Sequence, residues 1–203
     1  IREQGRGDGK PGRLKAIKAI GWYVDEYNMA QVSINLDNYP VTPPHIVYEE
    51  CVKDAKELNL AAAGSELVGL IPLEAMLMAA DYHIKKENLF ILDEKQKIRL
   101  VVERLGLNSV SRFIPEKRII EYMIEEKGNE PLASMTVRGF VELVGARTSA
   151  PGGGSVSALV ASLGAALGAM MGWMSYGSKK FESLDADMRR LIPPLHQNMK
   201  TLI

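Results

Sequence analysis

Cysteine is almost absent from this chain of 203 residues, because Cys51 is the single one. One thiol cannot form an internal disulfide or supply a cysteine-rich zinc site. The three histidines (His45, His83 and His196) are far apart in the sequence, which contains neither an HExxH nor a CxxC motif. Metal catalysis therefore has little support, and the sequence predicts no metal site.

An excess of one charge is also missing, since 25 basic residues balance 25 acidic ones. Without a net positive field, the chain lacks the signature of a nucleic-acid-binding protein. Hydrophobic residues make up 46% of the sequence and charged residues 25%. These shares are close to the globular average and argue against disorder, and the length fits one domain or two.

Start and stop signals are lacking at the two ends. Residue 1 is Ile rather than Met and leads directly into a charged stretch, with no signal peptide. Residues 188–203 keep an apolar helical face, with no glycine, asparagine or proline stop after it. We expect the sequence to be an internal piece of a longer polypeptide, with some functional residues outside it.

A hairpin is predicted near the start. Apolar residues over Leu14–Val24 and strictly alternating ones over Met29–Leu36 indicate two antiparallel strands, joined by the polar turn 25–28. In the second strand, Ala30 and Val32 belong to the set expected to point inward.

Helices and one more strand are predicted to follow. Thr42 before two prolines predicts a capped helix start, and a short apolar strand is expected over Ala61–Leu70. Pro72 opens a further helix through Ala80, and Leu92–Leu105 has the pattern of a charged amphipathic helix. Residues 1–105 are thus predicted to form an α+β layer, with helices on a mostly antiparallel sheet.

Residues 106–131 mix polar turns, a proline and charges, which favours a linker between domains. Residues 132–203 are richer in Ala, Gly, Met and Ser and are predicted to form an all-α helical part. It would contain a helix over Thr136–Val144 and a long helix from about Ser155 through Met174.

No charged residue occurs between Thr148 and Ser178, a run longer than the roughly 20 residues needed to cross a bilayer. Glycines at 164, 168 and 172 have the small-residue spacing of packed membrane helices. The apolar residues are nevertheless mostly Ala, Gly and Ser, a Pro-Gly-Gly-Gly break interrupts the run, and an aromatic belt is missing. We favour a buried helix of a bundle and keep the membrane helix as the alternative.

The strongest local signal is Ala150-Pro-Gly-Gly-Gly-Ser155, which runs directly into the long helix. Consecutive glycines let a ligand approach the backbone, and a helix N-terminus offers free N–H groups to a carboxylate or phosphate. The alternative is a plain helix-initiating turn with Ser155 as its cap. The motif is neither a Walker loop nor a dinucleotide fingerprint.

A second signal is the basic, glycine-rich loop Gln4–Arg13. Gly12 could expose its amide to a ligand, and Arg13 could make paired hydrogen bonds to a carboxylate. The alternative is a solvated surface loop. Cys51 and His45, taken alone, are expected to be structural.

Several motifs resemble one known family in this order along the chain. Residues 2–14 (REQGRGDGKPGRL), 19–23 (AIGWY), 30–33 (AQVS) and 64–72 (GSELVGLIP) resemble the C-terminal subdomain of glutamate formiminotransferase. Residues 145–155 (GARTSAPGGGS) and 189–194 (RRLIPP) resemble the start of formiminotetrahydrofolate cyclodeaminase. Together they are similar to the bifunctional formiminotransferase-cyclodeaminase family.

The resemblance implies a folate enzyme of histidine degradation, both a transferase and a lyase. It would transfer the formimino group of N-formimino-L-glutamate to tetrahydrofolate, bound as a polyglutamate. It would then convert 5-formiminotetrahydrofolate to 5,10-methenyltetrahydrofolate and ammonia. The expected setting is a cytoplasmic homo-oligomer that uses no metal, binds no nucleic acid and has no membrane span.

The resemblance also assigns sites. The transferase's folate contacts carry over to Gly12, Arg13 and Leu14. The cyclodeaminase folate pocket carries over to Ala150, Pro151, Gly152, Gly153, Gly154 and Ser155. The catalytic histidine of the transferase and the catalytic aspartate of the cyclodeaminase are expected before Ile1 and after Ile203. A non-catalytic folate-binding or oligomer-assembly fragment is the alternative function.

Overall fold

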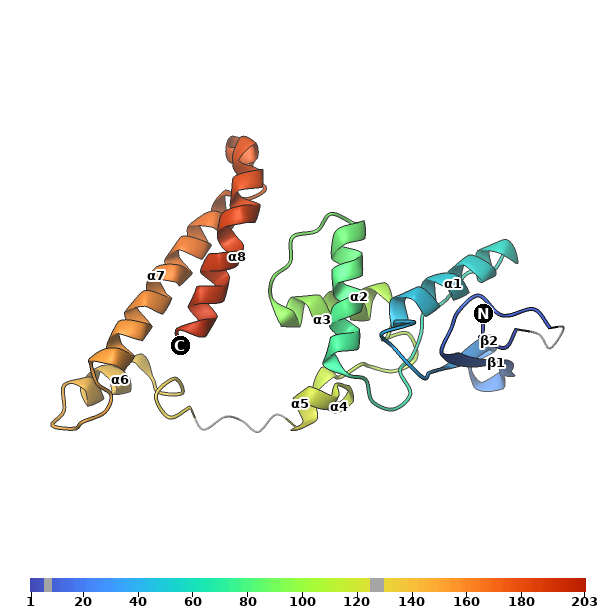
Figure 1. Cartoon of the computed structure of the whole chain (residues 1–203), viewed down its shortest axis with the longest axis horizontal. Coiled ribbons are helices and arrows are strands. Elements are labelled where there is room, and N and C mark those ends of the chain that lie inside the picture. The colour runs from blue at the N-terminus through green and yellow to red at the C-terminus, as the bar shows by residue number, and fades with distance from the viewer. Residues whose placement is uncertain (6–8, 125–129) are drawn as a thin grey trace. The chain divides into compact units, whose positions relative to one another are not determined.

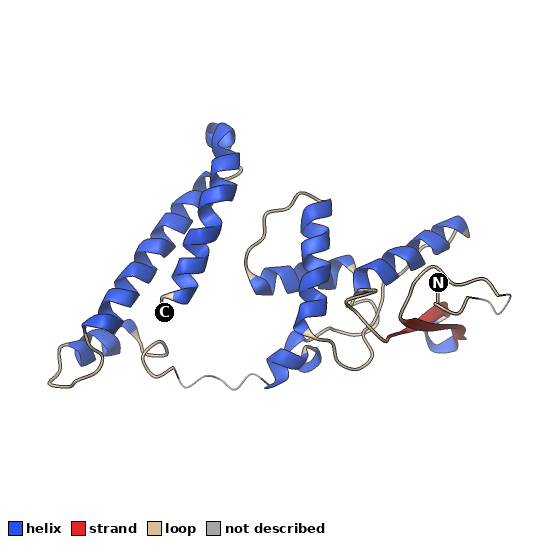
Figure 2. Cartoon of the chain, in the orientation of Figure 1, coloured by secondary structure: helices blue, strands red, loops and turns tan. Residues whose placement is uncertain are grey.

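The structure is a computed structural model that describes residues 1–5, 9–124 and 130–203. The chain forms two compact units, Ile1–Glu125 and Glu126–Ile203 (Figure 1). The first unit combines a small sheet with helices, and the described part of the second is helical (Figure 2). This content is consistent with the α+β and all-α parts expected from the sequence. Residues 6–8 of the basic loop and 125–129 of the predicted linker lie outside the described residues.

The predicted hairpin is confirmed. β1 (Ile17–Val24) pairs antiparallel with β2 (Met29–Leu36), with Ile17 opposite Leu36. The turn contains the 3-10 helix η1 (Asp25–Tyr27), and Asn28 closes it in a left-handed conformation with φ 51°. The alternation does not bury the expected face, however, because Val32 is 51% exposed. The alternating sequence correctly predicted a strand. One face of a sheet becomes buried only when another layer of the protein packs against it.

The third strand predicted over Ala61–Leu70 is wrong, because this segment is irregular. Gly64 and Gly69 have φ values of 140° and 85°, which a continuous strand does not allow. The segment is held instead by the loop after α3, where the Ser65 amide donates to the Gly106 carbonyl at 3.1 Å. Of the apolar side chains in this run, Leu67 packs against the core, whereas Val68 and Leu70 are exposed.

Three helices form the body of the first unit: α1 (Pro44–Glu57), α2 (Leu73–Lys86) and α3 (Glu94–Arg104). Side chains from α2, from α3, from the residues just before α2 and from the segment after α3 make one hydrophobic core: Ile71, Ala75, Met76, Ala79, Ala80, Ile98, Val101, Val102, Leu105, Leu107, Phe113 and Ile119. Burying a side chain the size of Met or Val stabilises the fold by about 1.5–3 kcal/mol. The Thr42 side chain does not cap α1, since its hydroxyl donates to the Lys15 carbonyl at 2.7 Å.

The segment predicted as a linker, 106–131, belongs largely to the first unit. It contains the short helices α4 (Pro115–Arg118) and α5 (Ile120–Ile124). Ile119 is fully buried and forms an isolated parallel bridge with Ile71. The prolines and charges that favoured a linker are surface residues between buried apolar ones.

The second unit has a helix pair at its centre. α6 (Val137–Val144) precedes α7 (Gly153–Ser175), and the 3-10 helix η2 (Lys179–Leu184) leads into α8 (Asp185–Thr201). α7 and α8 lie side by side (Figure 1). Gly172 provides the space for Ile192, which is fully buried. Gly168 and Gly172 thus serve close packing of the two helices, whereas a Cβ at Gly164 would meet no heavy atom within 4 Å.

By length and composition alone, α7 could cross a membrane. Its most apolar window has a mean hydropathy of 1.6, and 17% of that window is buried. Met171 and Met174 are 69% and 74% exposed. In the described part of the chain, α8 covers one side of α7, and the other sides are open.

Candidate functional site

Backbone hydrogen bonds within residues 1–14 hold the loop that is expected to bind folate. The Gly12 amide donates to the Glu3 carbonyl at 2.8 Å, and the Leu14 amide donates to the Ile1 carbonyl at 3.0 Å. A Cβ atom at Gly12 would lie 1.5 Å from the Arg2 carbonyl oxygen. Glycine is required here for close approach of two chain segments. The Gly12 amide expected to face a ligand is engaged inside the protein in this conformation.

Arg13 makes the paired hydrogen bonds expected of it, but to carboxylates of α1. One terminal nitrogen lies 2.6 Å from both oxygens of Asp54, and Nε lies 3.1 Å from Glu50 Oε2. The hydrogen bond to Asp54 raises the pKa of Arg13, which stays cationic. The Arg13 side chain is 45% exposed, so one side of the guanidinium still faces solvent.

The second candidate loop leads into α7 and is open to solvent apart from one residue. Pro151 is buried and follows a cis peptide bond, whereas Gly152, Gly153 and Gly154 are exposed. The Thr148 hydroxyl donates to the Ala150 carbonyl at 3.0 Å, which fixes the turn before the glycines.

The start of α7 has the geometry of an anion-binding helix end. Gly152 is the N-cap, without a side-chain cap among the described residues, and Ser155 lies inside the first turn instead of capping it. The first amides of a helix have no partner within the helix, and the helix dipole adds partial positive charge there. A Cβ at Gly153 or Gly154 would meet no heavy atom within 4 Å. A ligand can therefore reach this backbone directly.

The two candidate loops belong to different units. Within its own unit, the first loop lies against α1, and the second opens α7. Whether these residues contact folate stays a prediction.

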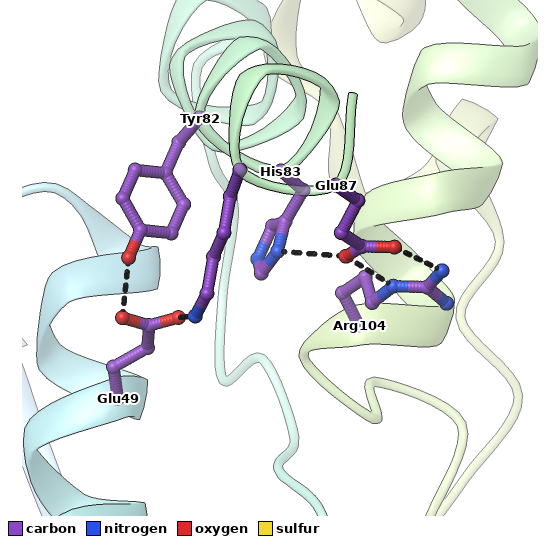
Figure 3. A network of polar contacts seen from close by, with 6 residues as sticks. Glu49, Tyr82, His83, Glu87 and Arg104 are labelled. Atoms are coloured by element: carbon purple, nitrogen blue, oxygen red, sulfur yellow. Dashed lines mark hydrogen bonds and ion pairs between the residues drawn. The ribbon is translucent and has the colours of Figure 1, made fainter. Parts of the chain in front are cut away.

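Sequence reasoning missed a polar network between α1, α2 and α3 (Figure 3). Tyr82 and Lys86 both donate to Glu49 of α1. Arg104 of α3 donates two hydrogen bonds, of 2.7 and 2.6 Å, to Glu87, the residue directly after α2. The available signal was the i, i+4 spacing of His83 and Glu87 on one helix.

Two buried histidines sit beside this network. The His45 ring stacks on Tyr82 with centroids 4.4 Å apart, and the His83 ring lies 6.5 Å from His45. Burial lowers the pKa of His45 to about 4 and also lowers the pKa of His83. Both rings are therefore neutral near pH 7.

Among the described residues, no group of three or more His, Cys, Asp or Glu side chains is placed to hold a metal ion. The prediction of a metal-free protein rests on the sequence alone.

Comparison with known proteins relates both units to one family. Residues 1–125 match the model of the formiminotransferase domain, and residues 136–203 match the model described as formiminotransferase-cyclodeaminase. Formimidoyltransferase-cyclodeaminase of Dictyostelium discoideum is 67% identical over 96% of this chain, and that of Mus musculus is 56% identical over 97%. Glutamate formimidoyltransferase of Thermoplasma acidophilum is 34% identical over 37% of this chain and 25% of its own length. The chain spans 36% of the length of the first two relatives.

Proposed function

The chain belongs to the formiminotransferase-cyclodeaminase family, and we propose that it is part of a bifunctional folate enzyme of histidine degradation. In the first reaction, the formimino group moves from N-formimino-L-glutamate to N5 of tetrahydrofolate. In the second, ring closure between N5 and N10 gives 5,10-methenyltetrahydrofolate and expels ammonia. The observation that carries this proposal is the match to both family models in order along one chain.

The second reaction would use the loop that opens α7. The exposed amides at Gly152–Gly154 and the partial positive charge of the helix end suit a carboxylate or the polar edge of a pterin. Their open surroundings support ligand approach at Gly153. We propose that Ala150 to Ser155 form part of the cyclodeaminase folate pocket.

The first reaction would use the loop around Arg13. Gly12, Arg13 and Leu14 are proposed to contact folate, with the exposed side of the Arg13 guanidinium as the polar partner. Because the Gly12 and Leu14 amides are engaged, their carbonyl groups are the backbone atoms available to a ligand.

The proposed enzyme is a cytoplasmic homo-oligomer that takes tetrahydrofolate and N-formimino-L-glutamate as substrates. Exposed apolar side chains on the hairpin and on α7, such as Ile20 and Met171, support association with further protein surface.

Because the catalytic residues of both reactions are expected outside residues 1–203, this piece alone is expected to be inactive. The decisive experiment therefore supplies the purified full-length protein with N-formimino-L-glutamate and tetrahydrofolate and follows both 5,10-methenyltetrahydrofolate and ammonia. The proposal expects both products. Folate binding without either product would favour the alternative of a non-catalytic folate-binding or assembly fragment.

A matched pair of variants tests the α7 loop within that assay. Gly153→Ala and Gly164→Ala both add a methyl group to α7 where no heavy atom lies within 4 Å. Gly153→Ala is expected to lower ammonia release by about tenfold or more, since small misplacements of substrate are costly. Gly164→Ala is expected to leave it unchanged. Equal rates in the two variants would remove Gly153 from the pocket.

A further inference from the structure

A pocket of about 500 Å³ lies among α1, α2 and α3. Gly12, Arg13 and Leu14 do not line it, although Glu50 of its lining pairs with Arg13. Its walls are mostly charged or polar: Tyr48, Glu49, Glu50, Val52, Lys53, Lys56, Glu57, His83, Lys86 and Arg104. The stems of these long side chains form much of the pocket surface, and their polar ends surround it.

His83 is the buried polar group of this pocket. The residue is 5% exposed, and neither ring nitrogen has a hydrogen-bond partner among the described residues. Its Nδ1 lies 3.5 Å from Glu87 Oε1, too far for a good hydrogen bond, although close enough for charge attraction. Buried polar atoms are almost always satisfied in folded proteins. An imidazole that lines a pocket without a partner points to a ligand.

The other charges around His83 are largely paired. Glu49 is held by Lys86 and Glu87 by Arg104 (Figure 3). Glu50 pairs with Arg13. Arg13 also binds Asp54, so Glu50 shares its cation with a second carboxylate.

Lys53 and Lys56 are different, because neither forms an ion pair with a described residue. They follow Glu49 at positions i+4 and i+7, which places all three on one face of α1. Glu57 adds a single opposing carboxylate to the lining. Lys53 and Lys56 are therefore the two cations of the lining that no described carboxylate pairs, and they lie in the same pocket as the buried His83 imidazole.

We propose that this pocket binds a compact anion, a phosphate or a carboxylate, through the ammonium groups of Lys53 and Lys56 and a hydrogen bond from His83. Both anions accept several charge-assisted hydrogen bonds, which are stronger than neutral ones. A volume of about 500 Å³ accommodates a small molecule. The proposal goes beyond the proposed function and does not depend on it.

Anion binding should be coupled to protonation of His83. A negative charge beside the imidazole favours its cationic form, so the anion should bind more tightly as the pH falls below neutrality. The charged and titratable groups that face His83 come from all three helices: His45, Glu49, Glu50, Lys53, Lys56 and Glu57 from α1, Tyr82, Lys86 and Glu87 from α2, and Arg104 from α3. The dependence on pH is read with succinate as the probe, because carboxyl groups titrate below histidine, whereas inorganic phosphate itself changes charge near pH 7.

The test is calorimetric titration of the purified protein with inorganic phosphate and, separately, with succinate, at constant ionic strength. Saturable binding of either probe is expected, and the tighter one identifies the class of anion. The double variant Lys53→Ala/Lys56→Ala should weaken binding by about tenfold or more. Absence of binding by both probes would overturn the proposal.

Two further variants keep the test specific. Lys95→Ala removes an exposed lysine of α3 that does not line the pocket, and it should bind like the unchanged protein. His83→Gln should weaken binding and abolish its dependence on pH. Equal affinities in the double lysine variant and Lys95→Ala, with circular dichroism showing both folded, would contradict the site.

Discussion

Arg13 is the residue where the predicted chemistry and the observed partner differ. The sequence predicted paired hydrogen bonds to a carboxylate, and the structure provides them from Asp54 within the same chain. The Arg13 guanidinium therefore has two possible roles, which are to bind a ligand and to anchor its loop to α1.

Two substitutions separate these roles. Arg13→Ala and Asp54→Asn both break the ion pair, which is partly exposed, so each should lower the free energy of unfolding by about 0.5–1 kcal/mol. If Arg13 also contacts folate, only Arg13→Ala should weaken folate binding, by about 1–3 kcal/mol. Denaturant titration and folate calorimetry measure the two effects. Equal weakening of binding in both variants would mean that Arg13 acts only through the loop.

Gly12 cannot be tested in the same way. Any side chain there would collide with the Arg2 carbonyl, so loss of binding would reflect a displaced loop.

The buried histidines predict that acid destabilises the first unit. The folded-state pKa of His45 is about 4, below its ordinary 6.5, because burial penalises the cation. The unfolded chain therefore takes up protons first, and stability falls as the pH drops from 6.5 toward about 4, then levels off for this group. A shift of this size corresponds to about 3 kcal/mol.

His45→Gln removes one titrating group and should flatten this dependence. The measurement is the urea midpoint of both proteins across that pH range. The variant is expected to be less stable at neutral pH, because the stack on Tyr82 is lost. The test therefore compares how steeply the urea midpoint changes with pH in the two proteins. Since Glu49 and Glu87 have lowered pKa values, their effects appear at lower pH. An unchanged slope would show that His45 does not contribute.

At the scale of elements, the pairing of α7 with α8 depends on glycine at one contact. A Cβ at Gly172 would lie 2.5 Å from Ile192 Cγ1, and Ile192 is fully buried. Gly172→Ala should therefore destabilise the second unit by about 1–3 kcal/mol, the typical effect of overpacking.

Gly164→Ala is the matched control on the same helix. Its Cβ would meet no heavy atom within 4 Å, so the better helix propensity of alanine should stabilise the unit by up to about 1 kcal/mol. Thermal unfolding followed by circular dichroism compares the variants. Stabilisation by Gly172→Ala would mean that the two helices do not pack as described.

For the whole molecule, the exposed apolar side chains of α7 could face either a membrane or another protein surface. The helix passes a length and composition test for crossing a membrane, yet Gly168 and Gly172 pack against an amphipathic partner that carries Arg189 and Arg190. We predict that the protein partitions into the aqueous phase of a detergent phase separation, because the exposed apolar area is suited to protein contacts. Recovery in the detergent phase would favour the membrane helix.

The sequence by itself determined the elements that rest on local signals. The β1–β2 hairpin followed from alternation and a polar turn, α1 and α2 from prolines at their first turns, and the family from motifs spread along the chain. These features depend on residues close in sequence, where backbone preferences and spacing suffice.

Only the tertiary structure decided which groups face one another. It showed that the apolar run 61–70 is not a strand, that Ile119 of the expected linker is buried in the core, and that Arg13 binds α1. It also placed His83 in a pocket with Lys53 and Lys56. Such contacts join segments distant in sequence, and they are selected by packing and charge satisfaction in the folded chain, which local periodicity does not encode.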